Sequence, residues 1–306
     1  TGLKYALFMY YKSDIREILK ERERKFWNYR RAAATEKTLL AEISKLYRLT
    51  KIVQVSVVIA VTFCLHMYFL KPLFNERTVF LFDSNMFVES TVLSTTVLMC
   101  QYYFPCTVIP IVLGFDSLYL SLCCEIIVQA KLLKNRLGRE LSTTKDGNNR
   151  GADGIAVCVK HHLFLLSIFA RMRRMYSVML FFHYFISLVT ACTDMYESFV
   201  GEVDLPNQIL KFLSVSIIFG EFAFYALPAE LVSSEFSDIS HAIYNSKWYK
   251  KDVPLQRMVL FVMKRTQREQ YFSDAGLMDI NIDAFGSVVR KTFSFYAIIR
   301  NLLDEK

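Results

Sequence analysis

The stretch FGSVVRKTFSFYAIIRNLL, Phe285–Leu303, decides how the fold of this chain is interpreted. It approaches the length of about 20 residues that a membrane-spanning helix needs, yet it contains Arg290, Lys291 and several hydroxyl or amide side chains. A charge near the centre of a bilayer costs at least ~2.5 kcal/mol, so such a helix must turn its polar side toward protein or water. The stretch therefore predicts a membrane helix with one face that avoids lipid.

The polar residues of this stretch share one face of the predicted helix. At about 100° per residue, the face forms a stripe that Arg290 and Leu302 flank. Two interpretations remain open. The stripe packs against neighbouring helices, or it lines a water-filled pore in which Ile298 and Leu302 form an apolar constriction that blocks ions. The stripe consists of Ser287, Lys291, Ser294, Ile298 and Asn301.

The composition of the whole chain is that of a helical membrane protein. Of its 306 residues, 53% are hydrophobic and 15% aromatic, and the net charge is +8. Nucleic-acid binding is a weaker explanation of the charge, because the basic stretches alternate with apolar segments of lipid-spanning length. The predicted class is all-α, a polytopic membrane protein, with spans at about Ile52–Leu70, Val92–Ile127, Met175–Thr190, Ile209–Leu231 and Asp283–Leu303.

The charges of the connecting segments predict the orientation of the spans. Basic residues crowd every second connection and are scarce in the others, as in DMYESFVGEVDLPNQ, which has four acids and no base. Lys and Arg accumulate on the cytoplasmic side of membrane proteins. We therefore expect the N-terminal side inside and the C-terminus outside. That orientation, and the lack of DRY-type and NPxxY-type motifs, disfavours a G-protein-coupled receptor.

Several smaller features accompany this pattern. The chain begins at Thr1 inside a short apolar run, so we expect part of a helix upstream. The polar segment Ser142–Gly154 is predicted to be a linker, and the cytoplasmic stretches to be helical extensions of the spans. Seven cysteines without a CxxC pair are expected to be buried and free. Asp116 and Glu125 are expected to pair with a cytoplasmic Arg rather than to transport ions. No catalytic, cofactor or metal-binding pattern is found among the histidines or elsewhere.

The last sixty residues resemble the insect odorant receptors. The matching sequence is YNSKWYKKDVPLQRMVLFVMKRTQREQYFSDAGLMDINIDAFGSVVRKTFSFYAIIR, and weaker likeness extends over the rest of the chain. The matching positions include Tyr244, Trp248-Tyr249, Arg265-Thr266-Gln267, Ala275-Gly276 and Lys291-Thr292-Phe293-Ser294. The family's frequent Pro soon after the Gln is replaced by Arg268-Glu269-Gln270, and the gustatory receptors' terminal Gln-Phe by Ile299-Arg300.

This resemblance implies a seven-helix fold with the first helix and part of the second missing. It implies a tuning subunit that forms a heterotetrameric, odorant-gated, non-selective cation channel with a shared co-receptor in the plasma membrane of olfactory neuron dendrites. The last helix would line the pore, with Ile298 at the gate. Residues 1–232 would form the odorant-binding bundle and 233–306 the cytoplasmic anchor plus pore helix. The expected anchor residues are Tyr244, Trp248, Arg265 and Gln267.

A volatile ligand is expected in the outer half of the bundle, in a dry cavity lined by aromatic, Met and hydroxyl side chains. The partners are then the odorant, the co-receptor and membrane lipid, with no nucleic acid. The alternatives are a gustatory-type ligand-gated channel and, less favoured, an atypical G-protein-coupled receptor. The candidate ligand-binding residues are Cys64, Met67, Tyr68, Leu98, Met99, Tyr102, Tyr103, Phe182, Phe185, Leu188, Leu213 and Ser216.

Overall fold

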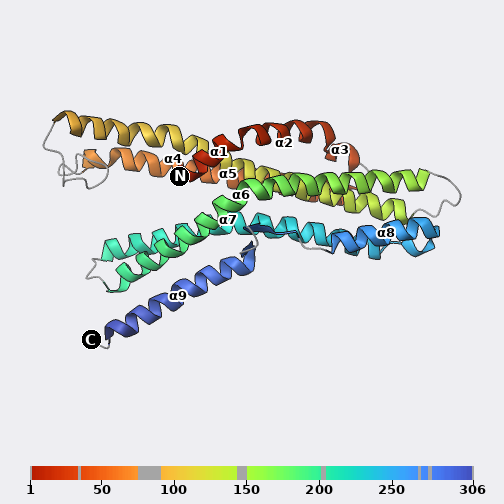
Figure 1. The fold of residues 1–306 in the computed structure, drawn as a ribbon. Helices are drawn as coiled ribbons and strands as arrows, with labels where there is room; N and C mark the ends of the chain where they lie inside the picture. Colours follow the sequence, from red (N-terminus) through yellow and green to blue (C-terminus); the bar gives the residue numbers. More distant parts are fainter. Residues whose placement is uncertain are drawn as a thin grey trace. The chain divides into compact units, whose positions relative to one another are not determined.

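A computed structural model of the chain describes residues 2–33, 36–74, 91–142, 150–200, 205–267, 270–274 and 278–304. These residues form long helices and one short hairpin (Figure 1). The all-α prediction is confirmed, and the hairpin is an addition to it. The helices are α1 Gly2–Tyr10, α2 Lys12–Lys25, α3 Tyr29–Ala32, α4 Lys37–Phe74, α5 Thr91–Ser142, α6 Arg150–Val200, α7 Leu205–Tyr244, the 3-10 helix η1 Trp248–Lys250, α8 Val253–Thr266 and α9 Ile282–Asp304.

The hairpin joins α8 to α9. Its strands β1, Phe272–Asp274, and β2, Met278–Ile280, pair antiparallel with Phe272 opposite Ile280. Among the described residues, four helices are long and apolar enough to cross a membrane, and they belong to α4, α5, α6 and α7. Helix α9 follows the predicted segment Asp283–Leu303 to within one residue at each end.

Several helices are longer than one membrane crossing. Helix α5 has 52 residues and α6 has 51, which at about 1.5 Å per residue gives each a length of roughly 75 Å, against about 30 Å of hydrocarbon. The expected helical extensions are therefore present. The predicted linker Ser142–Gly154 is too long, because α5 ends at Ser142 and α6 already begins at Arg150.

The chain divides into two compact units, of which the first comprises residues 1–13 and 38–122. Within it, Lys4 Nζ lies 3.0 Å from Asp116 Oδ2, so this carboxylate pairs with a lysine of α1, where a cytoplasmic Arg was predicted. Gln54 of α4 donates to Ser117 O at 2.9 Å and to Ser121 Oγ at 2.7 Å on α5. These contacts satisfy polar groups on the side of α4 that faces α5.

The second unit comprises residues 14–37 and 123–306. Its core lies between α6 and α7, which run side by side in Figure 1. Glu125 pairs with Arg22 at 3.0 Å, as predicted for a cytoplasmic partner. Lys134 Nζ lies 2.6 Å from Glu235 Oε2, which ties α5 to α7. The large buried side chains of this unit include Phe169, Tyr176, Phe222, Tyr225 and Phe236.

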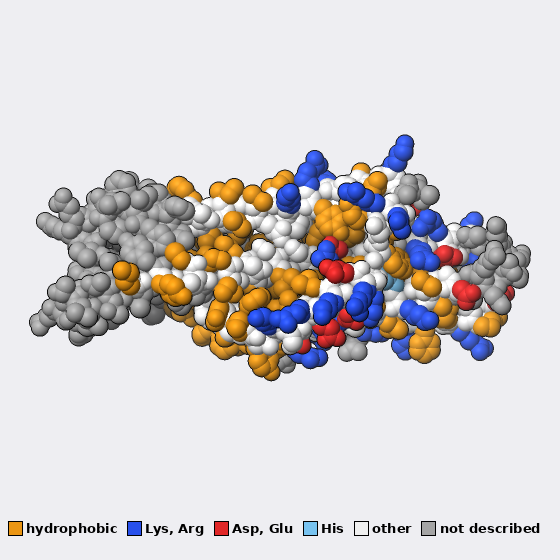
Figure 2. Space-filling model, turned by 90° about the horizontal axis from the view of Figure 1, so that it is seen from above, with side chains coloured by type: hydrophobic (Ala, Val, Ile, Leu, Met, Phe, Trp, Pro, Cys, Tyr) orange, Lys and Arg blue, Asp and Glu red, His pale blue; other side chains and the backbone are white. Residues whose placement is uncertain are grey.

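Lys and Arg side chains occupy one part of the face drawn in Figure 2, with hydrophobic side chains among them, while another part shows hydrophobic side chains without bases. This distribution follows the alternation of apolar and basic segments in the sequence. Cys123, Cys124, Cys158 and Cys192 are buried as expected, whereas Cys106 is exposed.

The turn between α2 and α3 is fixed to α5 and α6 through the buried side chain of Gln129. Gln129 Oε1 accepts from Trp27 N, and its Nε2 donates to Trp27 O, both at 2.9 Å. The His161 ring stacks on Trp27 with centroids 3.9 Å apart. In the tautomer with its proton on Nε2, His161 also donates to Gln129 Oε1 at 3.1 Å. The guanidinium carbon of Arg136 lies over the Trp27 ring, 4.9 Å from the ring centroid.

Replacing Gln129 with Leu tests this attachment. The substitution keeps the volume but leaves the backbone N–H and C=O of Trp27 without their partner, which costs about 1–3 kcal/mol. We expect a lower apparent melting temperature of the purified protein in detergent. Lys160→Leu, at an exposed position of α6, is the control and should change little. Equal melting temperatures for the two variants would show that the hydrogen bonds of Gln129 do not stabilise the protein.

Candidate functional site

The candidate site is the junction of α6, α7 and α9 in the second unit. Helix α9 starts with a side-chain cap, since Asn281 Oδ1 accepts from Ala284 N at 2.8 Å. Three residues four apart, Ala284, Val288 and Thr292, form its buried face. The Thr292 hydroxyl donates to Val288 O at 3.0 Å, so it is satisfied within its own helix. Small or β-branched side chains on this face let α9 pack closely against α6 and α7.

Aromatic rings from three helices meet beside this buried face. Phe222 of α7 stacks on Phe285 of α9 with centroids 6.1 Å apart, and Tyr184 of α6 meets Phe222 edge-on at 5.8 Å. His183 of α6 lies 5.3 Å from Tyr225 in the same manner. Aromatic pairs at these separations add roughly 0.5–1.5 kcal/mol each to the burial of their area. The layer therefore holds the first half of α9 on the bundle.

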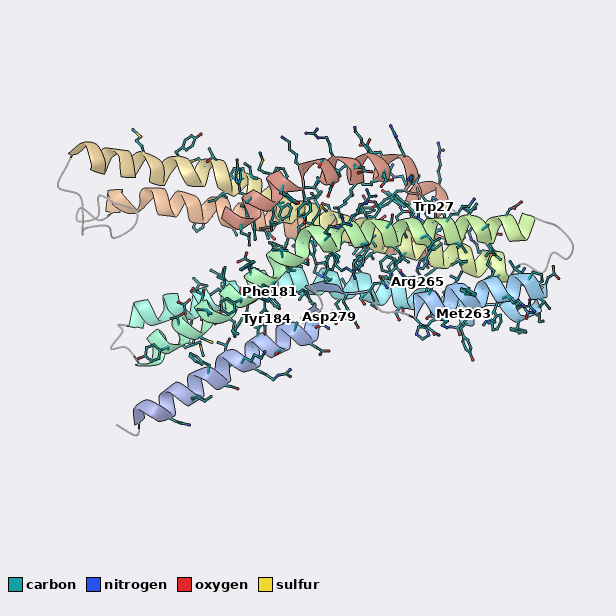
Figure 3. All side chains as sticks on the ribbon, viewed as in Figure 1. Trp27, Phe181, Tyr184, Met263, Arg265 and Asp279 are labelled. Carbon is teal, nitrogen blue, oxygen red and sulfur yellow. The ribbon has the colours of Figure 1, made fainter. Side chains whose placement is uncertain are left out.

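Lys291 of the polar stripe contacts this layer from its edge. Its Nζ donates to Tyr184 Oη at 3.2 Å and lies 5.9 Å from the centroid of the Tyr184 ring. Tyr184 itself is nearly buried, and it lies on the side of α6 toward the start of α9 (Figure 3). A hydroxyl and a ring face together stabilise an ammonium group in an apolar setting. Lys291 thus lies at the border between the buried face of α9 and its polar stripe.

The rest of the stripe is not covered by the described part of the chain. Ser287 is half-buried, whereas Ser294, Ile298 and Asn301 are exposed. Ile298, the expected gate residue, has 58% of its surface accessible. The side chain of Leu302 lies outside the described residues. The second half of α9 therefore presents most of the polar stripe, with the predicted gate residue Ile298, away from α6 and α7.

The hairpin before α9 is attached to the same two long helices. Phe272 of β1 is fully buried, and its ring meets Phe169 of α6 at 4.8 Å. Phe169 in turn meets Phe236 of α7 at 5.7 Å. Ile280 of β2, the cross-strand partner of Phe272, is also buried. A second aromatic contact, separate from the Phe222 layer, thus fixes the segment that enters α9.

The predicted anchor residues lie on the surface of η1, α8 and the end of α7. Tyr244, Arg265 and Gln267 are exposed, and Trp248 is half-buried. Their role in subunit contacts stays a prediction. Sequence reasoning missed Phe261, which is 79% exposed on α8. Buried Val259, Val262 and Thr266 recur at helical spacing, and this spacing would have put Phe261 on the opposite face.

The predicted ligand-binding residues on α6 and α7 point mainly outward. Phe182, Phe185, Leu213 and Ser216 are exposed, and Leu188 is half-buried. The Ser216 hydroxyl donates to Phe212 O at 2.9 Å in its own helix. On α5, Met99 and Tyr103 are exposed as well. The side chains of Cys64, Met67, Tyr68, Leu98 and Tyr102 lie outside the described residues, so their role remains a prediction.

The side chains that α6 and α7 turn toward each other are different ones. They include His183 and Tyr184 against Phe222, and Asp194, whose Oδ2 accepts from Ser214 Oγ at 2.5 Å. The choice from sequence followed residue type, whereas the face is set by the spacing of buried Tyr184, Ser187 and Ala191. Groups of His, Cys, Asp and Glu able to hold a metal are absent from the residues that the structure describes.

Comparison with known sequences gives one family. The sequence model of the 7tm Odorant receptor family matches residues 1–293. Odorant receptor 49a of Drosophila melanogaster is 19% identical over 198 residues, which cover 65% of this chain and 50% of that protein. Odorant receptor 85b of the same organism is 22% identical over 193 residues, covering 62% and 48%. This chain therefore spans about half the length of these relatives.

Comparison with solved structures gives the same fold. The insect olfactory receptor OR5 from Machilis hrabei superposes with a TM-score of 0.74 at 15% identity, over 97% of this chain and 76% of that one. Its structure in complex with eugenol superposes with a TM-score of 0.69 at 18% identity, over 86% and 69%. At such identities the likeness concerns the fold alone.

A double-mutant cycle tests the contact between α6 and α9. Tyr184→Phe and Lys291→Met each remove one side of the hydrogen bond, so each should lower the apparent melting temperature of the purified protein. Their combination should cost little more than either alone, with a coupling of about 0.5–1.5 kcal/mol. Arg290→Met, at the exposed neighbouring position, should combine additively with Tyr184→Phe. Additivity in both pairs would contradict the contact.

Proposed function

Because this chain belongs to the 7tm odorant receptor family, we propose that it is an odorant-tuning subunit of a heteromeric cation channel whose pore is lined by α9. Family membership makes the chain an odorant receptor with transmembrane helices and not an enzyme. Assembly with a co-receptor, gating of a cation current and a plasma-membrane location in the dendrites of olfactory neurons are parts of the proposal.

The two-sided character of α9 is the observation that carries the proposal. Its face of Ala284, Val288 and Thr292 is buried against its own subunit, while Ser294, Ile298 and Asn301 are exposed. Polar side chains on a membrane helix are costly to expose to lipid. The exposed stripe therefore needs water or another subunit beside it. A pore shared between protomers supplies that environment.

Ile298 suits a gate in such a pore. An apolar side chain that is exposed on a polar stripe narrows and dries a water-filled passage, and ions do not enter a dewetted constriction. Arg290 and Lys291 lie two turns before it on the same helix. Four copies of this basic pair around one axis would repel cations, whereas mixing with less basic subunits would reduce that repulsion. This supports a heteromeric assembly with a co-receptor.

Odorant binding is proposed in the outer half of the helix bundle. A ligand opens the channel only if it binds the open arrangement more tightly than the closed one. The aromatic layer of Tyr184, Phe222 and Phe285 links α6 and α7 directly to α9. A ligand that changes the packing of α6 against α7 therefore acts on the pore helix through that layer. One structure that shares this fold, the insect olfactory receptor OR5 from Machilis hrabei, was solved in complex with eugenol.

Current recording from cells tests the proposal. The full-length receptor, expressed with the co-receptor and exposed to a panel of volatile compounds, should give cation currents that neither subunit alone gives. With sodium outside and potassium inside at equal concentrations, the reversal potential should lie near zero, because a non-selective pore passes both cations about equally. Surface expression without any odour-dependent current in the pair, across a broad panel, would contradict the proposal.

A substitution at the gate gives a sharper test. Ile298→Ser replaces the apolar constriction with a hydroxyl, so water and ions should enter without ligand, and we expect a several-fold higher unliganded current. Ile217→Ser on α7 is the matched control, because Ile217 is the same residue type and also 58% exposed. It should leave the unliganded current unchanged. A normally trafficked Ile298→Ser receptor with wild-type unliganded current would remove Ile298 from the gate.

A further inference from the structure

One face of α4 carries exposed basic side chains followed by exposed apolar ones. With Arg48 set to zero on a wheel of about 100° per residue, the members of this face lie within roughly 60° on either side. The three basic residues occupy its first part and the four apolar residues its second part, and all seven are exposed. We call this surface the α4 face; it consists of Lys45, Arg48, Lys51, Ile52, Val55, Ile59 and Phe63.

The opposite side of α4 is packed within the first unit. Gln54 donates to Ser117 O at 2.9 Å and to Ser121 Oγ at 2.7 Å on α5, and Ile43 on the same side of α4 is fully buried. On the same wheel these two residues lie roughly 120–140° from Arg48. Helix α4 therefore turns Gln54 toward α5 and turns the α4 face away from α5.

The dimensions of the α4 face match one leaflet of a bilayer. From Lys45 to Lys51 the helix rises about 9 Å, and from Ile52 to Phe63 about 16 Å. A hydrocarbon core of about 30 Å with a polar layer on each side gives half-thicknesses of this size. The basic part then lies at the level of lipid headgroups and the apolar part at the level of one set of acyl chains.

The charge of the α4 face favours one kind of lipid. Glu42 lies off the face, and from Ile43 to Phe63 the sequence contains no Asp or Glu. Three cations at headgroup level attract a phosphate together with a further negative group, and a zwitterionic headgroup would set its own cation against them. Each basic residue near an anionic surface strengthens binding by roughly fivefold.

We propose that the α4 face binds an anionic phospholipid, with its headgroup on Lys45, Arg48 and Lys51 and an acyl chain along Ile52, Val55, Ile59 and Phe63. On the positive-inside assignment this is a lipid of the cytoplasmic leaflet. The inference requires that α4 crosses the membrane and does not depend on ion conduction. A second copy of the chain is a poorer occupant, because a two-fold contact through the same patch would bring six cations together.

Native mass spectrometry of the purified full-length receptor tests this site. Phosphatidylserine and phosphatidylcholine with identical acyl chains are titrated separately, and the dissociation constant of the first bound lipid is measured. The wild-type protein should prefer phosphatidylserine. The triple variant Lys45→Gln, Arg48→Gln, Lys51→Gln should weaken phosphatidylserine binding by on the order of 100-fold, since each cation contributes roughly fivefold, with phosphatidylcholine binding unchanged.

Matched variants separate the site from the overall charge. Lys20→Gln, Arg24→Gln, Arg31→Gln removes three exposed cations from α2 and α3 and should keep the preference, as should Lys45→Arg, Lys51→Arg. Glycerophosphoserine, which lacks acyl chains, should compete poorly. Equal loss in both triple variants, equal affinity of the wild-type protein for the two lipids, or full competition by glycerophosphoserine would each overturn the proposal. A changed oligomeric mass with unchanged lipid binding would instead assign the α4 face to a subunit contact.

Discussion

A bilayer offers no hydrogen-bond partner to the backbone, and this constraint shapes the described part of the chain. Every N–H and C=O at membrane depth must be paired within its own helix, which accounts for the unbroken helix through the apolar segments of α4, α5, α6 and α7. Charged side chains follow the same logic. Glu125 and Glu235 pair with bases, and the exposed cations cluster at the ends of the apolar segments. The two surfaces proposed to function, the polar stripe of α9 and the α4 face, are those where polar and apolar side chains are exposed together.

The fold could be predicted from sequence as far as hydropathy and charge determine it. The crossing segments, their helical extensions and α9 follow from these two quantities. The helix ends in the polar stretches do not follow from them, and α6 begins at Arg150 inside the predicted linker. The hairpin was missed because strands of three residues show no alternation. The burial of Phe272 involves a contact with Phe169, which lies about a hundred positions earlier in the chain and cannot be identified from the local sequence.

The candidate site shows the same limit at the level of single residues. The polar stripe of α9 is visible in the sequence because it needs only helical periodicity. The partner of Lys291 is not visible in the sequence, because Tyr184 lies 107 positions away. Choosing ligand-binding residues by type selected Phe182 and Phe185, whereas packing turned Tyr184 and Ser187 inward. Residue type indicates which contacts a side chain could make, but the helix face on which it lies determines whether it points into the bundle.

Two attachments determine how α9 can respond to the bundle. Phe272 fixes the hairpin at its entry, and Phe285 with Lys291 fixes its first half, both against α6 and α7. The outer half, with Ile298, lacks comparable cover from the described residues. A helix held at one end transmits a small tilt of α6 or α7 to its far end with the largest displacement there. On the proposed function, a constriction would therefore open in the exposed half of α9 and not in the half that packs against α6 and α7.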